Sequence, residues 1–430
     1  MNIHIAPSKS TWSDIIKRPT RKSKDLHSIV SEVFEKVKAE GDQGLRYFTA
    51  QFDQVKINDL RVTDLEIKEA IENVNPQLKK AIQVAQENIK KFHQNQIFEE
   101  RPVETMQGVN CWRKSTAIDK VGLYIPGGTA PLFSTVLMLG IPAKIAGCRD
   151  IVLVSPPNQE GKIHPAILYA AQLIGIEQIY KVGGIQAIAA LTFGTESIPA
   201  VYKIFGPGNQ FVTAAKERAI LEGVAIDMPA GPSEVLVFAD EFANPEFIAA
   251  DLLSQAEHGI DSQSVLVSTS ELIITKTKVE VEKQLALLPR KEIAAQSIAN
   301  SIVIHIPTLS EAMDLINDYG PEHFIVMSKE EAEILARITN AGSVFIGDYT
   351  PESAGDYASG TNHTLPTNGF AKAYSGVSLD SFCKRITFQK ITKEGLKLLG
   401  PSIEVMAENE KLDAHKNAVA LRLKHTDANT

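Results

Sequence analysis

The stretch KVGLYIPGG at positions 120–128, followed by the apolar run LFSTVLMLG at 132–140, begins a pattern that repeats further along the chain. In it, a short β-rich segment ending in glycine precedes a segment with helical spacing. Three more such pairs follow: DIVLVSPP with PAILYAAQLIG, QIYKVGG with IQAIAALTF, and VYKIFGPG with FVTAAKERAIL. This alternation is typical of βαβ units and predicts a parallel sheet covered by helices.

The same alternation resumes after Glu234. Its β-rich segments are VLVFAD, QSVLVSTS, SIVIHIP, HFIVMS and SVFIGD, with helical stretches between them. We therefore predict an α/β fold with two units in series. Helices with charged outer faces are predicted upstream, from about residue 26 to 96, and a largely helical segment is predicted at 401–424.

Composition excludes several classes of protein. The chain has 430 residues, of which 44% are hydrophobic and 22% charged, with a net charge of -8. This balance is ordinary for a globular protein and argues against a nucleic-acid surface, which needs a basic stripe. The cysteines Cys111, Cys148 and Cys383 are far apart and odd in number, so we expect a reducing, cytoplasmic environment.

No targeting or membrane segment is predicted. The N-terminal sequence MNIHIAPSKSTWSDIIKRPT lacks the basic-then-apolar order of a signal peptide. The least polar run, at 129–147, contains Pro131, Pro142 and Lys144 and is rich in small residues. A buried helix fits this run better than a membrane span.

Three glycine-rich turns follow predicted strands, in YIPGGTAP, KVGGIQA and FGPGNQF. They begin near Tyr124, Gly183 and Gly206. Glycines let backbone N–H groups approach a phosphate, and the following helix N-terminus favours negative charge. None of the three is a GxGxxG, so the dinucleotide fingerprint is absent. A nucleotide site and plain turns between strand and helix both remain open.

The segment DLLSQAEHGIDSQ, at 251–263, contains a polar residue on an apolar helix face. At about 100° per residue, Gln255 falls ~20° from Ile248 and ~60° from Leu252, on the buried side. His258 lies one turn further, at the border of that face. A buried amide must be hydrogen-bonded or coordinated, so the spacing fits either two metal ligands or a polar helix end capped by Gly259.

Two further motifs lie next to predicted strands. Ser233, in MPAGPSEVLV, precedes a strand but is not in a GxSxG nucleophile elbow, which leaves substrate contact or a plain turn. Glu322 and His323, in NDYGPEHFIV, can supply acid–base chemistry, because histidine titrates near neutral pH and a nearby carboxylate shifts its pKa. Neighbours within a strand face opposite ways, so the turn must present both.

The segment at 349–375 is predicted to be a shaped loop, because Pro351, Gly355, Gly360 and Pro366 disfavour regular structure. It carries two candidate site residues, Asp356 and His363. Two more, Glu410 and His415, lie in the predicted C-terminal helices. Gln255, His258, Asp356 and His415 form a mixed nitrogen and oxygen set suited to Zn²⁺ or a similar ion, although spacing alone does not bring them together.

Seven long segments occur in a fixed order: VGLYIPGG, KIFGPGNQFVTAAK, DMPAGPSEVLV, DLLSQAEHGIDSQ, GPEH, SAGDYASGTNHTLPT and DAHKNAV. Through them the sequence resembles the histidinol dehydrogenase family over nearly its whole length. The resemblance implies a zinc-dependent, NAD-linked four-electron oxidation of L-histidinol to L-histidine through L-histidinaldehyde, the last step of histidine biosynthesis.

The resemblance also implies roles for particular residues. One Zn²⁺ per subunit would be bound by Gln255, His258 and Asp356, joined by His415 from the other subunit of a homodimer. Tyr124, Gln186 and Asn209 would line the NAD site. Glu322 and His323 would transfer protons, and Ser233, His363 and Glu410 would contact the substrate together with the metal ligands and the catalytic pair.

The family's fold implies two incomplete Rossmann-like domains in a dimer that exchanges its ends. The implied division is an N-terminal arm at 1–22, a first α/β domain at 23–123 plus 238–378, an NAD-side domain at 124–237, and a C-terminal extension at 379–430 that reaches the other subunit. The first twenty residues match the family more loosely than the rest.

Three alternatives to this mechanism can be stated from the sequence. A thiol route would use Cys111 or Cys148, although neither neighbours a base. A zinc hydrolase would use the same metal cluster to activate water without NAD. A metabolite-binding protein would keep the fold without catalysis. We favour the route in which His323 is the base and Glu322 activates water.

Overall fold

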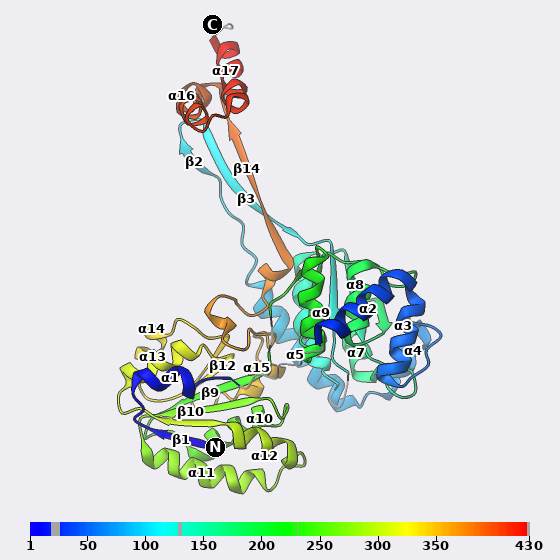
Figure 1. Cartoon of the computed structure of the whole chain (residues 1–430), viewed down its shortest axis with the longest axis vertical. Coiled ribbons are helices and arrows are strands. Elements are labelled where there is room, and N and C mark those ends of the chain that lie inside the picture. Colours follow the sequence, from blue (N-terminus) through cyan, green and yellow to red (C-terminus); the bar gives the residue numbers. More distant parts are fainter. Residues whose placement is uncertain (19–25, 128–130, 230, 428–430) are drawn as a thin grey trace. The chain divides into compact units, whose positions relative to one another are not determined.

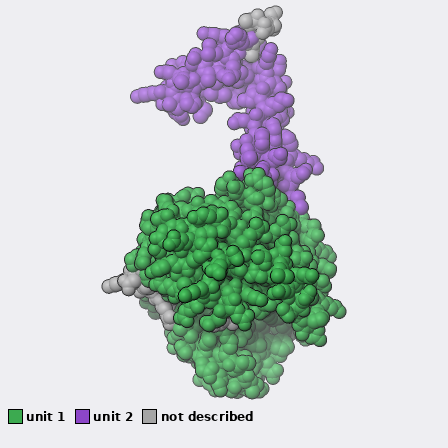
Figure 2. Space-filling view, turned by 90° about the vertical axis from the view of Figure 1, so that its right-hand side faces the viewer, with its two compact units in different colours: residues 1–96, 118–382 green, residues 97–117, 383–430 purple. Residues whose placement is uncertain are grey.

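The computed structural model describes residues 1–18, 26–127, 131–229 and 231–427. These residues form two compact units, which are described separately (Figure 2). One comprises residues 1–96 and 118–382, and the other residues 97–117 and 383–430. Residues 19–22 of the predicted arm and 129–130 of the predicted apolar helix lie outside the described residues.

A six-stranded parallel sheet forms one half of the larger unit (Figure 1). Its strand order is β1-β11-β10-β9-β12-β13. Every residue of β9 and β10 is buried, as expected for strands covered on both faces. The strands are β1 (Asn2–Ile5), β9 (Glu234–Ala239), β10 (Gln263–Ser268), β11 (Ile302–His305), β12 (His323–Met327) and β13 (Ser343–Ile346).

Helices cover both faces of this sheet. Alternate residues of β9 enter the two cores: Val235 and Val237 pack on one side, Leu236 and Phe238 on the other. The first face carries α10 (Pro245–Ala256), α11 (Glu271–Leu285) and α12 (Lys291–Asn300). The second carries α1 (Trp12–Ile15), α13 (Leu309–Tyr319) and α14 (Glu331–Arg337).

A five-stranded parallel sheet forms the other half, in the order β6-β5-β4-β7-β8. Its strands are β4 (Lys120–Tyr124), β5 (Asp150–Ser155), β6 (Gln178–Lys181), β7 (Lys203–Phe205) and β8 (Ala225–Ile226). The helices between them are α6 (Phe133–Ala146), α7 (Pro165–Leu173), α8 (Gly184–Phe193) and α9 (Gln210–Leu221).

The predicted N-terminal helices pack on this second sheet. They are α2 (Leu26–Glu40), α3 (Asp42–Phe48), α4 (Asp64–Asn73) and α5 (Pro76–Gln94), with a π-helical turn at Thr49–Asp53. Val30, Val33, Phe34 and Val37 form one buried face of α2, which contacts α8 and α9. Helices α4 and α5 contact α7 and α6.

Both parallel sheets share one topology. Apart from the edge strand β1, the first strand of each sheet in chain order (β9 or β4) lies between the second and the fourth, so the chain reverses direction across the sheet at β9/β12 and β4/β7. Such switch points are where α/β proteins form ligand crevices. The predicted α/β fold with parallel sheets is therefore confirmed.

The segment at 349–375 departs from the predicted loop at one place. Helix α15 (Glu352–Tyr357) lies within it, so the prediction of irregular structure is wrong for these residues. Gly355 allows close packing there: a Cβ at this position would lie 2.6 Å from Cε1 of Phe345. Short 3-10 turns at Lys9–Thr11, Phe370–Lys372 and Leu379–Phe382 complete this unit.

The smaller unit is an antiparallel sheet with two helices. The strands β2 (Val103–Met106), β3 (Val109–Ala117) and β14 (Cys383–Ile391) pair in the order β14-β3-β2. Helices α16 (Lys393–Asn409) and α17 (Asp413–Asp427) pack on each other, which confirms the predicted C-terminal helices. None of the helices in the described ranges combines the length and apolarity that a bilayer crossing requires.

Candidate active site

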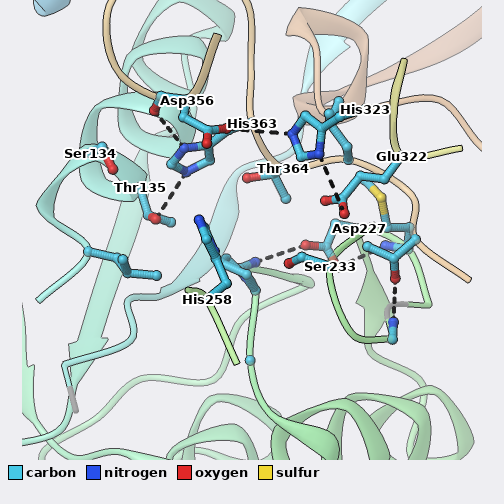
Figure 3. A pocket seen from close by; sticks show the side chains of 18 of the residues that line it. Ser134, Thr135, Asp227, Ser233, His258, Glu322, His323, Asp356, His363 and Thr364 are labelled. Carbon is cyan, nitrogen blue, oxygen red and sulfur yellow. Dashed lines mark hydrogen bonds and ion pairs between the residues drawn. The ribbon is translucent and has the colours of Figure 1, made fainter. Parts of the chain in front are cut away.

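A pocket of about 130 Å³ lies between the two parallel sheets of the larger unit. It is at the carboxyl edge of the five-stranded sheet, next to Gly206 after β7, and at the amino edge of the six-stranded sheet, next to His323 at the start of β12. Figure 3 shows side chains from both halves of the larger unit around it, among them Thr135, His258, Glu322, His323, Asp356 and His363.

Contacts across the pocket connect the loop after α15 with α6. Asn362 donates a hydrogen bond of 2.6 Å from Nδ2 to the carbonyl oxygen of Met138. Nδ1 of His363 lies 2.8 Å from the carbonyl oxygen of Asp356, so Nδ1 must carry a proton. Burial lowers the pKa of His363. The neutral ring then accepts a hydrogen bond at Nε2 from the hydroxyl group of Thr135, at 3.1 Å.

Glu322 and His323 are buried and share one backbone partner. The N–H of Glu234 donates to Oε2 of Glu322 at 2.8 Å, and the carbonyl oxygen of Glu234 lies 3.2 Å from Nδ1 of His323. The two residues do not face opposite ways, because Glu322 precedes the first residue of β12. Nδ1 of His323 lies 3.7 Å from Oε2 of Glu322. The turn thus presents both side chains together, as acid–base chemistry by this pair requires.

Two more carboxylates surround the His323 ring. Its Nε2 lies 3.5 Å from Oδ1 of Asp356, and its Nδ1 lies 3.5 Å from Oε1 of Glu352. Oε2 of Glu352 accepts a hydrogen bond of 3.0 Å from Ser254. Glu352 is not among the predicted site residues. Its signal in the sequence is its position four residues before Asp356, which places both on one helix face once α15 is recognised.

Burial and mutual attraction shift the pKa values of this cluster. Burial raises the pKa of Glu322 and that of Glu352 to about 8 each, although His323 opposes both shifts. Burial alone would lower the pKa of His323, but the surrounding carboxylates raise it to about 10. Burial opposes ionisation of Asp356 as well, yet interaction with His323 lowers its pKa. The protein without metal therefore favours an imidazolium next to the Asp356 carboxylate.

Several buried donors on β12, α15 and α10, a helix that contacts α15, are suited to a divalent cation, although Gln255 of α10 is not among the described residues that line the pocket. Both amide atoms of Gln255 are buried without a hydrogen-bond partner among the described residues, as are Nε2 of His323 and Oε1 of Glu352. Unpaired buried polar atoms are costly and need an explanation. Ligand atoms of His323, Glu352 and Asp356 lie within 4.8 Å of one another. This oxygen and nitrogen set fits Zn²⁺ or a similar ion.

The predicted buried position of Gln255 is confirmed, but the end of its helix differs from the prediction. Helix α10 ends at Ala256, and Glu257 is its C-cap in a right-handed conformation. Gly259 is therefore not a left-handed cap, and His258 lies in the turn beyond the helix. His258 lines the pocket and is an exposed residue, but its ring is desolvated by its neighbours enough to lower its pKa.

The residues predicted to contact NAD lie in two places. Oη of Tyr124 accepts a hydrogen bond of 3.3 Å from the N–H of Gly184, and Nε2 of Gln186 lies 3.4 Å from Oδ2 of Asp53. Asn209 is the N-cap of α9 and lines a neighbouring pocket of about 660 Å³. Ser233 and His258 line both pockets.

The remaining predicted residues lie in the smaller unit. Glu410 is the C-cap of α16 and His415 is in the first turn of α17; both are exposed. Their roles stay predictions. Cys111 and Cys383 are also in this unit, and Cys148 is buried in the larger one. None of the three cysteines is among the described residues that line the pocket.

The fold and the pocket together define an α/β enzyme whose site is built between two parallel sheets. Comparison with known proteins narrows this class. The family model for histidinol dehydrogenase matches residues 16–423. The chain belongs to the histidinol dehydrogenase family, whose members are oxidoreductases.

Individual relatives are similar over nearly their full length. The chain is 60% identical to a histidinol dehydrogenase of Bacteroides fragilis strain YCH46 over 417 residues, 97% of each chain. It is 53% identical to one from Campylobacter jejuni, covering 95% of this chain and 96% of that one. The crystal structure of histidinol dehydrogenase from Elizabethkingia anophelis superposes with a TM-score of 0.98 at 57% identity, covering 99% of both chains.

Proposed function

We propose that the protein oxidises L-histidinol to L-histidine through L-histidinaldehyde, with NAD as the hydride acceptor and one Zn²⁺ per subunit. The observation that carries this proposal is the buried pair Glu322 and His323, which faces a pocket also lined by His258 and Asp356. Membership of the family over residues 16–423 supports the choice of substrate.

The metal would be held by Gln255, His258 and Asp356, completed by His415 from a second copy of the chain. The unpaired amide of Gln255 supports this set, because a ligand amide oxygen needs no other partner. When bound, the cation would fix the amino alcohol and polarise its oxygen. We prefer this set to His323, Glu352 and Asp356, because a coordinated His323 would not be available as a base.

His323 would act as the base in both oxidations. In the first, it takes the hydroxyl proton of the alcohol while a hydride leaves the carbon. Water then adds to the aldehyde, with Glu322 as the group that removes its proton. His323 takes a hydroxyl proton again when the hydrate loses the second hydride. The sum is one histidinol, two NAD⁺ and one water giving histidine, two NADH and three protons. His323 must be neutral to act as a base, whereas the surrounding carboxylates raise its pKa to about 10 in the metal-free protein. The role therefore requires that bound metal and substrate lower this pKa.

The NAD site is proposed along Tyr124, Gln186 and Asn209. Tyr124 is the last residue of β4, Gln186 is in the first turn of α8, and Asn209 caps α9. These positions are at the carboxyl edge of one sheet, where helix N-termini favour a pyrophosphate. NAD would supply the oxidising group, and the chain would orient it.

A homodimer is proposed from the smaller unit. Val405 and Met406 of α16 are 59% and 65% exposed, and Ile386, Phe388 and Ile391 of β14 are also exposed. Of the β14 residues, Ile386 and Phe388 lie on one face of the strand. Exposed apolar side chains that gather on one face can mark a protein interface. A second copy of the chain would cover them and could bring its His415 and Glu410 to the site.

The direct test is NADH formation, followed by absorbance, with histidinol and NAD⁺ supplied to the zinc-loaded protein. We expect two NADH per histidinol, with histidine as product and loss of activity after chelation. A zinc hydrolase would instead cleave an ester or amide without NAD, and a binding protein would take up histidinol without turnover. Intact zinc with no NADH formed would overturn the proposal.

A further inference from the structure

The N-terminal segment is built into the six-stranded sheet. β1 pairs with β11 at the sheet edge, from Asn2 opposite Ile302 to Ile5 opposite His305. Trp12 and Ile16 are buried in the core under α13. The segment therefore has a fixed path before it reaches Arg18.

Arg18 binds a buried carboxylate. Its Nε and Nη2 contact the two carboxylate oxygens of Glu234, Nη2 at 2.7 Å from Oε1. Nη2 also lies 2.9 Å from the carbonyl oxygen of Tyr319, and the guanidinium carbon is 3.9 Å from the centre of the Tyr319 ring. A guanidinium that binds both oxygens and stacks on a ring holds its partner in one orientation.

Tyr319 extends this contact to the next strand. Its hydroxyl group lies 3.2 Å from Oε2 of Glu234 and 2.8 Å from Oε1 of Gln263, the first residue of β10. Tyr319 is 0% exposed and Glu234 is 2% exposed. Burial opposes the charge on Arg18, but the hydrogen bonds to Glu234 raise the pKa of Arg18. The positive charge of the Arg18 guanidinium thus balances the negative charge of the buried Glu234 carboxylate.

The backbone of Glu234 holds the catalytic pair. Its N–H donates to Glu322 at 2.8 Å, and its carbonyl oxygen lies 3.2 Å from Nδ1 of His323. One residue is therefore fixed by Arg18 through its side chain and contacts both proton-transfer groups through its main chain. A displacement of about 1 Å in such a support can slow the chemistry ~100-fold.

We propose that Arg18 is a positioning residue for the proton-transfer pair, acting through Glu234, whose backbone orients Glu322 and His323. This inference rests on the proposed function of that pair. The N-terminal segment thereby has a role in the site, because it supplies the cation that fixes the orientation of Glu234, the first residue of β9.

The test compares Arg18→Met and Arg18→Lys with Lys9→Met. Lys9 is a matched control because it is a cation of the same N-terminal segment. It forms an ion pair with Asp314 of α13 at 2.8 Å, and both side chains are more than half exposed. We expect Arg18→Met to lower kcat about 10- to 100-fold with KM for histidinol within about threefold. Arg18→Lys should recover part of kcat, millimolar guanidinium should partly rescue Arg18→Met, and Lys9→Met should match the parent protein.

Arg18→Met alone leaves the buried Glu234 carboxylate without its cation, which could unfold the protein. The double variant Arg18→Met/Glu234→Gln removes that charge as well, so it separates loss of positioning from loss of folding. We expect it to fold and to retain the low kcat. A folded Arg18→Met with kcat within twofold of the parent, or a double variant with parental kcat, would overturn the inference.

A readout independent of activity separates this inference from the proposed function. The proton on Nδ1 of His323, bonded to Glu234, should give a downfield imidazole resonance, assigned by its loss in His323→Asn. We expect this resonance to shift or disappear in Arg18→Met and to persist in Lys9→Met, whether or not the parent oxidises histidinol. An unchanged resonance in Arg18→Met would contradict the positioning role.

Discussion

Nε2 of His363 lies 3.1 Å from the hydroxyl oxygen of Thr135, and this hydrogen bond joins the loop after α15 to the first turn of α6. The two residues come from opposite halves of the larger unit. A polar contact therefore links the two sides of the pocket through a predicted substrate-binding histidine, whose tautomer is fixed by the contact of Nδ1 with the carbonyl oxygen of Asp356.

Removing the Thr135 hydroxyl group should impair substrate binding. Thr135→Val keeps the volume but leaves Nε2 of His363 without its donor, so we expect KM for histidinol to rise several-fold. The free energy of unfolding should fall by about 1–2 kcal/mol. Steady-state kinetics and thermal unfolding measure both. Thr192→Val is the control, since the Thr192 hydroxyl group donates to the carbonyl oxygen of Ile188 within its own helix, α8. This variant should alter stability alone. An equal rise of KM in both variants would contradict the assignment.

Gln255→Met should separate stability from metal binding. The parent buries two amide atoms without partners, and replacing them by an apolar side chain of similar size should stabilise the metal-free protein by on the order of 1–3 kcal/mol. The same change should weaken zinc binding at least about tenfold. Unfolding in chelator and competition with a zinc indicator test the two effects. Parental zinc affinity in this variant would remove Gln255 from the ligand set.

Asp251→Asn should change how stability depends on pH. Burial raises the pKa of Asp251 to about 7, from an ordinary value of 3.8. Between these values the folded state binds more protons than the unfolded state, so the carboxyl group stabilises the fold at low pH and loses that contribution as pH rises to 7. Relative to the parent, the variant should gain on the order of 2–4 kcal/mol from pH 4 to 8.

Urea unfolding of the chelated protein across this pH range is the measurement. Asp314→Asn is the control, because it makes the same substitution at a carboxylate that is more than half exposed. Parallel curves for the parent and Asp251→Asn would show that the buried carboxyl group does not titrate in this window.

Glu322→Gln should act mainly on the second oxidation. If Glu322 activates water, its amide still accepts the hydrogen bond from Glu234 but cannot take a proton. Product analysis should show histidinaldehyde accumulating and fewer than two NADH per histidinol. His323→Asn should instead slow both oxidations, by about 100- to 10,000-fold. Full stoichiometry at a uniformly reduced rate in Glu322→Gln would assign the water step to another group.

The cysteines should be dispensable for chemistry. Cys148 is buried near the carbonyl oxygen of Phe382, and Cys111 is on β3 of the smaller unit. We expect Cys111→Ala combined with Cys148→Ala to retain activity within a few-fold, with a stability loss from the cavity at Cys148. A loss of activity by several orders of magnitude in the folded variant would revive the thiol route.

The fold could be predicted because its signals are local. VLVFAD and DIVLVS are apolar runs of strand length bounded by turns, and buried parallel strands require such runs. Gly183 and Gly206 are also local signals, because each marks a turn between a strand and the following helix. The buried face of α10 follows from its helical period, which places Gln255 on the same side as Ile248 and Leu252.

Parts of the site could not be predicted, because they depend on contacts between distant positions. Arg18 and Glu234 are 216 positions apart, and no local pattern distinguishes Arg18 from a surface cation. Glu352 escapes prediction because Pro351 and Gly355 indicate a loop. The helix forms there because Gly355 packs against Phe345, a tertiary contact that outweighs the local propensity.

The pairing of β1 with β11 has a consequence for how the protein is made. Asn2 leaves the ribosome long before its partner Ile302, which is synthesised 300 positions later. At ~5–20 residues per second, the first strand waits about 15–60 s with its backbone groups unpaired. The nascent chain must keep this segment from pairing wrongly, so chaperone binding near the N-terminus and sensitivity of yield to translation rate are expected of this architecture.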